Sequence, residues 1–261
     1  MTSSVRRLDT EDLTSRVQAM YREVALHPEQ GFHFETGRPL AERLGYDPSQ
    51  LDRIPAPAID SFAGVGYFLD LAAIEAGETV LDLGSGSGMD SLLAAVATGP
   101  GGAVIGVDMT PEQLAKATRL AAGAGLANVA FREGRIEAPP VDPGSVDCVV
   151  SNGVINLAPD KGAVFTAAAE ALRPGGRLAL ADIVTEGELP AGVTCNASLW
   201  ASCIGGAMQQ GRYLEAIEGA GFEILEVRAN ERYRFLSDQA VNASREYGVK
   251  SVSLLARRPG A

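Results

Sequence analysis

Residues 79–88 read Thr-Val-Leu-Asp-Leu-Gly-Ser-Gly-Ser-Gly, a short apolar run followed directly by a glycine-rich loop. Such a run between turn residues is typical of a strand that is covered on both faces of a parallel sheet. The glycines predict a turn in which the backbone approaches a ligand without a Cβ atom in between. A second apolar run, residues 103–107, ends at Asp108. This order predicts a strand–helix–strand unit with a ligand at the carboxyl end of its strands.

The same alternation of strand and helix patterns continues along the chain. Apolar runs predict strands at about 79–84, 103–107, 128–132, 146–151, 177–183, 223–229 and 249–256. Helical spacing predicts helices at about 88–97, 111–124, 161–172 and 209–220. Because strands alternate with helices, we expect an α/β fold with a seven-stranded, mostly parallel sheet and helices on both faces.

The chain divides by pattern into a cap segment and a main domain. Residues 10–25 carry an apolar stripe at helical spacing, and prolines interrupt the stretch that follows. We expect residues 1–60 to form a helical cap over the ligand cleft, with an ordinary packing appendage as the alternative. In the main domain, residues 61–261, the segments 184–208 and 230–247 are insertions that we expect to wall a second ligand site.

Composition limits the partners. The formal net charge of −11 argues against nucleic acid, which needs clustered Lys and Arg. The sequence has no run of 18 apolar residues and no signal-peptide pattern at its N-terminus, so we expect a cytoplasmic protein without a membrane partner. Cys148, Cys195 and Cys203 are odd in number and lack zinc-site spacing, so no metal is expected. Nothing in the composition predicts an oligomeric state.

The glycine spacing distinguishes two adenosine-containing cofactors. Nicotinamide-binding loops follow the pattern G-x-G-x-x-G and receive a pyrophosphate. Here the pattern is G-x-G-x-G, and Asp82 precedes it. A carboxylate at that point suits the ammonium group of S-adenosylmethionine, although Asp82 as a strand-end acid bonded to its own turn is the alternative. Asp108, at the tip of the second strand, lies where a ribose diol is held in such units.

Motifs in four places resemble the class I S-adenosylmethionine-dependent methyltransferases, over roughly residues 60–257. They are VLDLGSGSGMD at 80–90, VIGVDMT at 104–110, FREGRIEAPPVDPGSVDCVVSNGVINL at 131–157 and ALRPGGRLALADI at 171–183. Within that family, GFHFETGR, IGVDMTPEQL, GRIE, SNGVINLAPDK and LWASCIGGAM most closely resemble the arsenite methyltransferase branch. The resemblance implies a Rossmann-like fold whose last two strands form an antiparallel edge hairpin. It also implies methyl transfer from S-adenosylmethionine, with S-adenosylhomocysteine as product, to a small molecule.

The resemblance also implies which residues hold the cofactor. Asp82, Gly84, Ser85, Gly86 and Gly88 are expected at the methionine end, Asp108 at the ribose, and Met109, Arg135 and Ile136 around the adenine. Ser151 and Asn152 are expected beside the methyl group, with strand-end capping as the alternative. Many relatives have an acid where Arg135 stands, so a backbone contact from Ile136 is expected at the adenine edge.

The acceptor side departs from the arsenite branch. That branch holds trivalent arsenic with cysteine thiolates just past the glycine loop, after the fourth strand, and in the LWxxCxGG stretch. Here the first two positions are Ser91 and Gly153, and only Cys203 remains. One thiolate does not chelate a soft centre as three do. We therefore expect a small organic metabolite as acceptor, with arsenite bound by Cys203 as the alternative.

Candidate residues for the acceptor site follow from residue type and position. Arg38, Asn156 and Trp200 are expected to contact the acceptor. His33 is the expected base near neutral pH, with a structural role between Phe32 and Phe34 as the alternative. Asp182, at the tip of the fifth strand, is the second candidate base or a loop cap.

Two other functions stay open as distant alternatives. An NAD-dependent oxidoreductase is disfavoured by the glycine spacing and by the lack of an obvious Tyr-x-x-x-Lys pair. A non-catalytic cofactor-binding module is disfavoured by the intact acids and glycines of the first two motifs.

Overall fold

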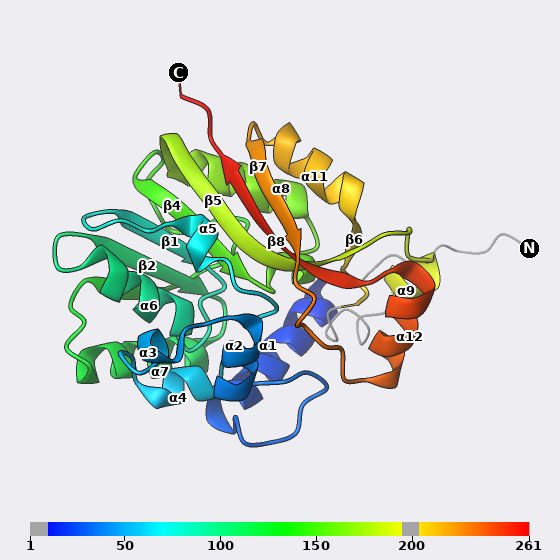
Figure 1. Ribbon diagram of the computed structural model, residues 1–261, viewed down its shortest axis with the longest axis horizontal. Coiled ribbons are helices and arrows are strands. Elements are labelled where there is room, and N and C mark those ends of the chain that lie inside the picture. Colours follow the sequence, from blue (N-terminus) through cyan, green and yellow to red (C-terminus); the bar gives the residue numbers. More distant parts are fainter. Residues whose placement is uncertain (1–9, 195–203, 261) are drawn as a thin grey trace, which may run out of the picture.

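A twisted eight-stranded sheet forms the centre of the computed structural model, which describes residues 10–194 and 204–260 (Figure 1). The strand order is β3-β2-β1-β4-β5-β8-β7, and β6 pairs with β5 off this path. The strands are β1 (Thr79–Leu83), β2 (Ala103–Asp108), β3 (Val129–Glu133), β4 (Val146–Asn152), β5 (Leu172–Thr185), β6 (Met208–Gln209), β7 (Glu223–Ala229) and β8 (Lys250–Arg257). The expected α/β fold and its seven predicted strands are confirmed, and the two-residue β6 is an addition.

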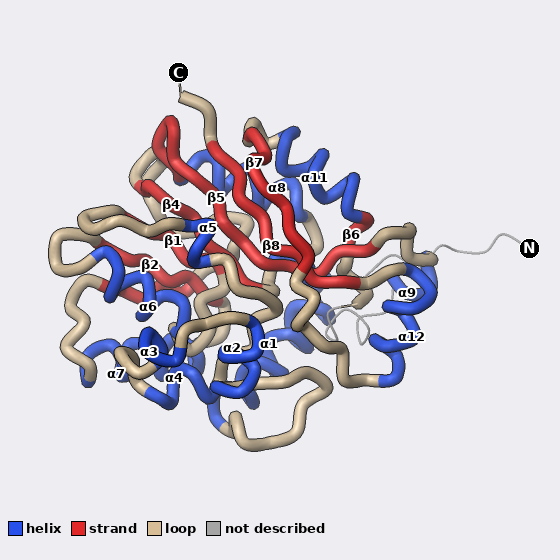
Figure 2. Tube along the Cα trace, viewed as in Figure 1, coloured by secondary structure: helices blue, strands red, loops and turns tan. Residues whose placement is uncertain are grey.

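Strand directions also agree with expectation. Strands β1 to β5 pair in parallel, whereas β8 runs antiparallel to both β5 and β7. The final two strands are therefore an antiparallel pair, with β8 inside the sheet and β7 at its edge (Figure 2). Helix α12 connects them, so they do not form a tight hairpin.

Helices cover both faces of the sheet. They are α1 (Thr10–Leu26), α2 (Arg38–Leu44), α3 (Pro48–Leu51), α4 (Ala56–Asp60), α5 (Leu69–Ala72), α6 (Met89–Thr98), α7 (Pro111–Gly123), η1 (Ile155–Leu157), α8 (Lys161–Ala171), α9 (Ala191–Thr194), α11 (Gln210–Gly219) and α12 (Asp238–Tyr247). Among the described helices, none is long and apolar enough to cross a membrane.

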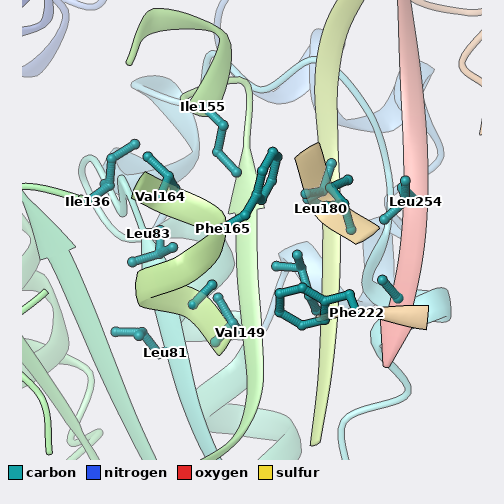
Figure 3. Packing of buried hydrophobic residues seen from close by; sticks show 14 of the residues in the cluster. Leu81, Leu83, Ile136, Val149, Ile155, Val164, Phe165, Leu180, Phe222 and Leu254 are labelled. Atoms are coloured by element: carbon teal, nitrogen blue, oxygen red, sulfur yellow. The ribbon is translucent and has the colours of Figure 1, made fainter. Parts of the chain in front are cut away.

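Alternating side chains of the central strands build two separate cores. Leu81, Leu83 and Val149 point to one face and pack with Val164 and Phe165 of α8 (Figure 3). Their neighbours Val80, Cys148 and Val150 point to the other face and pack with residues of α1, α6 and α12. This period of two follows from strand geometry and explains why both sets of alternating positions in these strands carry apolar side chains.

The N-terminal helices pack on the main domain. Leu13 and Val17 of α1 are buried in the same core as Val80. Gln18 Nε2 donates to the carbonyl of Met109 at 2.5 Å, and Gln113 Nε2 donates to the carbonyl of Tyr21 at 2.8 Å. These bonds fix α1 beside the carboxyl end of β2 and the start of α7.

The two segments expected as insertions contain short elements. Residues 184–208 include α9 and lead into β6, and residues 230–247 contain α12, which the sequence analysis did not predict. Helix α12 buries Ala240 and Ala243 and begins at Ser237, whose hydroxyl accepts from the Ala240 N–H. The division at residue 60 stays a prediction.

Candidate functional site

A pocket lies where the parallel strands β1, β2 and β4 end. Its walls include the glycine loop after β1, residues 108–110 after β2, residues 134–137 after β3 and Asn152 of β4. Helix α1 lines the same pocket with Leu13, Thr14, Val17 and Tyr21. The carboxyl edge of an open parallel sheet is where α/β folds bind ligands, and the glycine loop predicted this position.

Backbone conformation explains two of the loop glycines. Gly84 has φ of 78°, and a Cβ atom there would lie 2.4 Å from a methyl carbon of Val154. Gly88 has φ of 92° and precedes α6, and an added Cβ would lie 2.9 Å from the Phe131 ring. Glycine is therefore required at both positions. Gly84 and Gly86 line the pocket, whereas Gly88 lies under the loop, outside the residues that form the pocket wall.

Asp108 is held rigidly at the pocket wall. Its Oδ2 accepts from the Gly86 N–H at 2.9 Å, and its Oδ1 accepts from the Thr110 N–H at 2.8 Å. Burial raises the pKa of Asp108, and these backbone hydrogen bonds oppose that rise. The carboxylate keeps acceptor capacity for a ligand, since each oxygen has a second lone pair.

Asp82 and Asp90 form an acid pair in the pocket. Their exposed fractions are 3% and 6%, and both line the wall. Asp82 accepts from the Ser91 hydroxyl at 2.5 Å. Burial, followed by repulsion from Asp90, raises the pKa of Asp82 to about 8, and burial raises the pKa of Asp90 to about 6. A cationic ligand would offset this unfavourable burial of charge.

Ser85 supplies a further polar group. Its Oγ is buried in the pocket wall and has no hydrogen-bond partner among the described residues. Buried hydroxyls are usually hydrogen-bonded in folded proteins. The pocket therefore has a place for a polar ligand atom.

Part of the pocket wall is apolar. Met109 and Ile136 line it, together with Arg135, whose half-exposed side chain pairs with Glu137 at 3.1 Å. Phe62, Val154, Leu157 and Pro159 add further apolar surface. Such walls suit the flat, weakly polar body of an organic ligand.

Several predicted residues lie outside the wall of this pocket. Ser151 is buried, and its hydroxyl donates to the Leu83 carbonyl at 2.9 Å. Arg38 forms exposed ion pairs with Glu42 and Asp52, each at 2.7 Å. His33 contacts the Phe34 ring edge-on at a centroid distance of 4.7 Å.

Asp182 and Asn156 belong to a different buried cluster. Asp182 is fully buried and accepts from the Tyr213 hydroxyl at 2.7 Å and from the Ile183 N–H at 2.8 Å. Asn156 is also fully buried, and its carbonyl accepts from Lys161 Nζ at 3.2 Å. Trp200 and Cys203 lie outside the described residues. The roles of all these residues stay predictions.

Sequence reasoning did not name Asp90 or Gln113 as pocket residues, and it expected a cap from residues 1–60 without naming any pocket residue of α1. Asp90 stands two residues after Gly88 inside the first motif, so its position was a usable signal. Nothing in the local sequence connects α1 to β2, because the contact joins Gln18 to Met109 across 91 positions.

Comparisons with known proteins agree with this geometry. Residues 74–221, more than half of the chain, match the methyltransferase domain family. The arsenite methyltransferase of Halobacterium salinarum is 42% identical over 228 residues, which cover 86% of this chain and 58% of that protein. The human arsenite methyltransferase is 40% identical over 138 residues, covering 49% of this chain and 37% of that protein. The chain thus spans about half the length of the curated relatives it matches.

Solved structures give the same result. An arsenic(III) S-adenosylmethionine methyltransferase of Chlamydomonas reinhardtii superposes with a TM-score of 0.64 at 30% identity, covering 86% of this chain and 74% of that one. Geranyl diphosphate C-methyltransferase of Streptomyces coelicolor reaches a TM-score of 0.69 at 17% identity, covering 95% and 97%, and supports the fold alone. The chain therefore belongs to the S-adenosylmethionine-dependent methyltransferase family, in its arsenite methyltransferase-like branch.

Proposed function

We propose that the chain transfers a methyl group from S-adenosylmethionine to a small organic acceptor. One observation carries this proposal: a single pocket joins the glycine loop, the fixed carboxylate of Asp108 and an apolar wall from α1 and η1. S-Adenosylmethionine supplies a methyl group on a positively charged sulfur, which an electron-rich acceptor atom attacks. The family membership favours this cofactor over the nicotinamide alternative.

The pocket residues fit the cofactor by type. Asp108 has lone pairs left for ribose hydroxyls, and the unpartnered Ser85 hydroxyl is available to a polar ligand atom. Burial raises the pKa of Asp82 to about 8, and a bound ammonium group would lower this pKa and favour the carboxylate. Met109 and Ile136 offer apolar surface for an adenine ring. Gly84 and Gly86 allow the backbone itself to approach the ligand.

Orientation and exclusion of water are what the protein must provide. Leu13, Val17 and Tyr21 of α1 close the pocket with apolar side chains. Correct alignment of two reactants supplies up to roughly 7–11 kcal/mol in favourable cases. We therefore propose the N-terminal segment, residues 1–60, as the cover of the site, and residues 61–261 as the domain that holds the cofactor.

Two of the three arsenic-binding positions implied by the resemblance hold no thiol, which supports an organic acceptor. Ser91 is fully buried and bonded to Asp82, and Gly153 has no side chain. Cys148 lies in the sheet core, where burial raises the pKa of its thiol to about 12. His33 and Asp182 remain the candidate bases. A base is needed only if the acceptor must lose a proton before it attacks the methyl group.

Arsenite is the second candidate acceptor, because the relative at 42% identity over 228 residues is named an arsenite methyltransferase. In that case Cys203 would be the ligand of trivalent arsenic. For either acceptor, we propose a cytoplasmic protein with a small-molecule partner and, from the net charge of −11, no nucleic acid.

The test follows release of S-adenosylhomocysteine from S-adenosylmethionine. One arm supplies arsenite with excess thiol, and the other supplies a panel of small phenols, amines, thiols and carboxylic acids. Turnover with an organic acceptor that Cys203→Ser leaves unchanged would support the proposal. Turnover only with arsenite, lost in Cys203→Ser and kept in the control Cys195→Ser, would replace it. No cofactor binding at all would overturn both.

A further inference from the structure

Asp90 is held in the pocket wall by two side-chain hydrogen bonds. The Tyr46 hydroxyl donates to its Oδ1 at 2.6 Å, and Asn152 Nδ2 donates to its Oδ2 at 3.1 Å. Tyr46 lies between α2 and α3, Asp90 lies at the start of α6, and Asn152 ends β4. Three separate parts of the chain therefore fix one carboxylate.

Asn152 extends this network to the loop at Val65 and Gly66. Its Nδ2 also donates to the Tyr46 oxygen and to the Gly66 carbonyl, both at 3.1 Å. Its Oδ1 accepts from the Val65 N–H at 2.8 Å. The Gly66 N–H also donates to Oδ1, at 3.4 Å, and the two Nδ2 hydrogens are shared among three acceptors. This amide therefore has little rotational freedom, so it positions Asp90 rather than adapting to it.

Asp90 has no counter-ion in the part of the chain that the structure describes. There its hydrogen-bond donors are neutral, and it takes part in no ion pair. In the same described part, the donor to the Asp82 carboxyl is the neutral Ser91 hydroxyl. Both acids line the pocket that also contains the unpartnered Ser85 hydroxyl. Buried carboxylates without a cation are costly, so they point to a cationic ligand.

The methyl donor and the product of the proposed reaction differ in charge. S-Adenosylmethionine carries an ammonium and a sulfonium cation, whereas S-adenosylhomocysteine carries only the ammonium. A buried carboxylate attracts the extra charge strongly, because the effective dielectric constant is low away from water. Once the methyl group has left, this attraction is lost and the product is held less tightly.

We propose that Asp90, positioned by Tyr46 and Asn152, makes the pocket select the cationic methyl donor over its neutral-sulfur product. This inference rests on the proposed function, because it takes S-adenosylmethionine as the ligand. It assigns to Asp90 a role in cofactor specificity and product release that does not depend on the identity of the acceptor.

Calorimetric titration of the full chain with each ligand tests the proposal without an acceptor. In Asp90→Asn, the Kd of S-adenosylmethionine should rise at least about tenfold, while that of S-adenosylhomocysteine should change less than about threefold. Tyr46→Phe keeps the carboxylate. It should lower the ratio of the Kd of S-adenosylhomocysteine to the Kd of S-adenosylmethionine, but by a smaller factor than Asp90→Asn. Glu226→Gln removes one exposed charge from β7 and should leave the ratio as in the wild type.

The outcomes separate the two proposals. A parallel loss of affinity for both ligands in Asp90→Asn, with a normal thermal unfolding curve, would overturn the role in charge selection. If Asp90→Asn does not fold, the ratio in Tyr46→Phe decides, and an unchanged ratio there overturns the role. A wild-type chain that binds neither ligand would instead overturn the proposed function.

Discussion

Two buried acidic clusters of this protein differ in what surrounds them. Asp82 and Asp90 face the pocket and have raised pKa values, and within residues 10–194 and 204–260 their hydrogen-bond donors are all neutral. Asp182 is equally buried, and burial raises its pKa to about 6. Hydrogen bonds from Tyr213 and the Ile183 N–H, followed by the positive charge of Lys161, oppose that rise. It also lies outside the pocket wall. The protein thus supplies a cation to one cluster and leaves the other to a ligand.

All three acids are buried, so burial alone does not distinguish an acid that stabilises the fold from one that binds a ligand. The surrounding charges do. Lys161 donates to the carbonyls of Asn156 and Ala158, at 3.2 and 3.0 Å, in the segment whose Leu157 and Pro159 line the pocket. The Asp182 cluster therefore supports the shape of the wall, whereas the Asp82 and Asp90 pair is part of the wall. Substitutions in the two clusters should affect different measurements.

The largest effect is expected on stability, in Asp182→Ala. This change removes a buried carboxylate that accepts from the Tyr213 hydroxyl and the Ile183 N–H. Two buried donors then lose their acceptor, which costs about 1–3 kcal/mol each in the free energy of unfolding. Urea denaturation measures this loss, and Tyr213→Phe should cost only about 1 kcal/mol. A stable Asp182→Ala protein without methyl transfer would instead support Asp182 as the base.

Asp82→Asn should show the opposite pattern. Burial raises the pKa of Asp82 from its ordinary 3.8 to about 8, so between these values ionisation favours the unfolded chain. The amide removes this penalty, and the free energy of unfolding of the ligand-free protein at pH 7 should not fall. The Kd of S-adenosylmethionine should rise about tenfold or more. A clear loss of stability at pH 7 would contradict the distinction between the clusters.

Lowering the pH should reduce the preference for the cationic ligand. The pKa of Asp90 is raised to about 6, so its carboxylate is ionised above that pH and protonated below it. Tyr46, Asn152, Asp82 and Asp108 are the polar groups around Asp90. The pKa of Asp82 is raised to about 8, so its carboxyl is largely protonated from pH 7.5 to 5.5, and Asp90 is the acid of the pair whose ionisation changes most over this range. The ratio of the Kd of S-adenosylhomocysteine to that of S-adenosylmethionine should therefore fall over this range. A ratio that stays constant from pH 7.5 to 5.5 in the wild type would contradict selection of the methyl donor by the charge of Asp90.

The smallest effect is expected where α1 meets the cofactor end. Gln18→Ala removes the bond to the Met109 carbonyl and should cost about 1 kcal/mol of stability. If residues 1–60 cover the site, the affinity for S-adenosylmethionine should also fall by a few fold. Arg16→Ala, which removes an exposed pair with Asp12 on the same helix, is the matched control and should leave affinity unchanged.

The parts of the fold that local patterns encode were predictable. The apolar runs 79–84 and 146–151 correspond to β1 and β4, and the loop containing Gly84 and Gly86 lines the pocket, as its spacing predicted. Helix α12 was missed because its buried face consists of small residues, Ala240 and Ala243, which give a weak apolar pattern.

The network around Asp90 was not predictable from the sequence. Tyr46 lies 44 positions from Asp90, and Asn152 lies 62 positions away. Nothing near Tyr46 signals a buried acid as its partner, because only the packing of the cap segment on α6 brings them together. Asp82 and Asp108 were predictable because they stand at strand ends, where topology alone places them at the ligand.

The position of β8 has a consequence for how the protein folds during synthesis. Strand β8 pairs with β5 from Arg177 to Val184 and separates it from β7. While the ribosome is still adding residues 186–249, the backbone groups along that edge of β5 have no partner. An uncovered apolar edge invites pairing with another chain, so this interval is when the nascent protein most needs protection by chaperones.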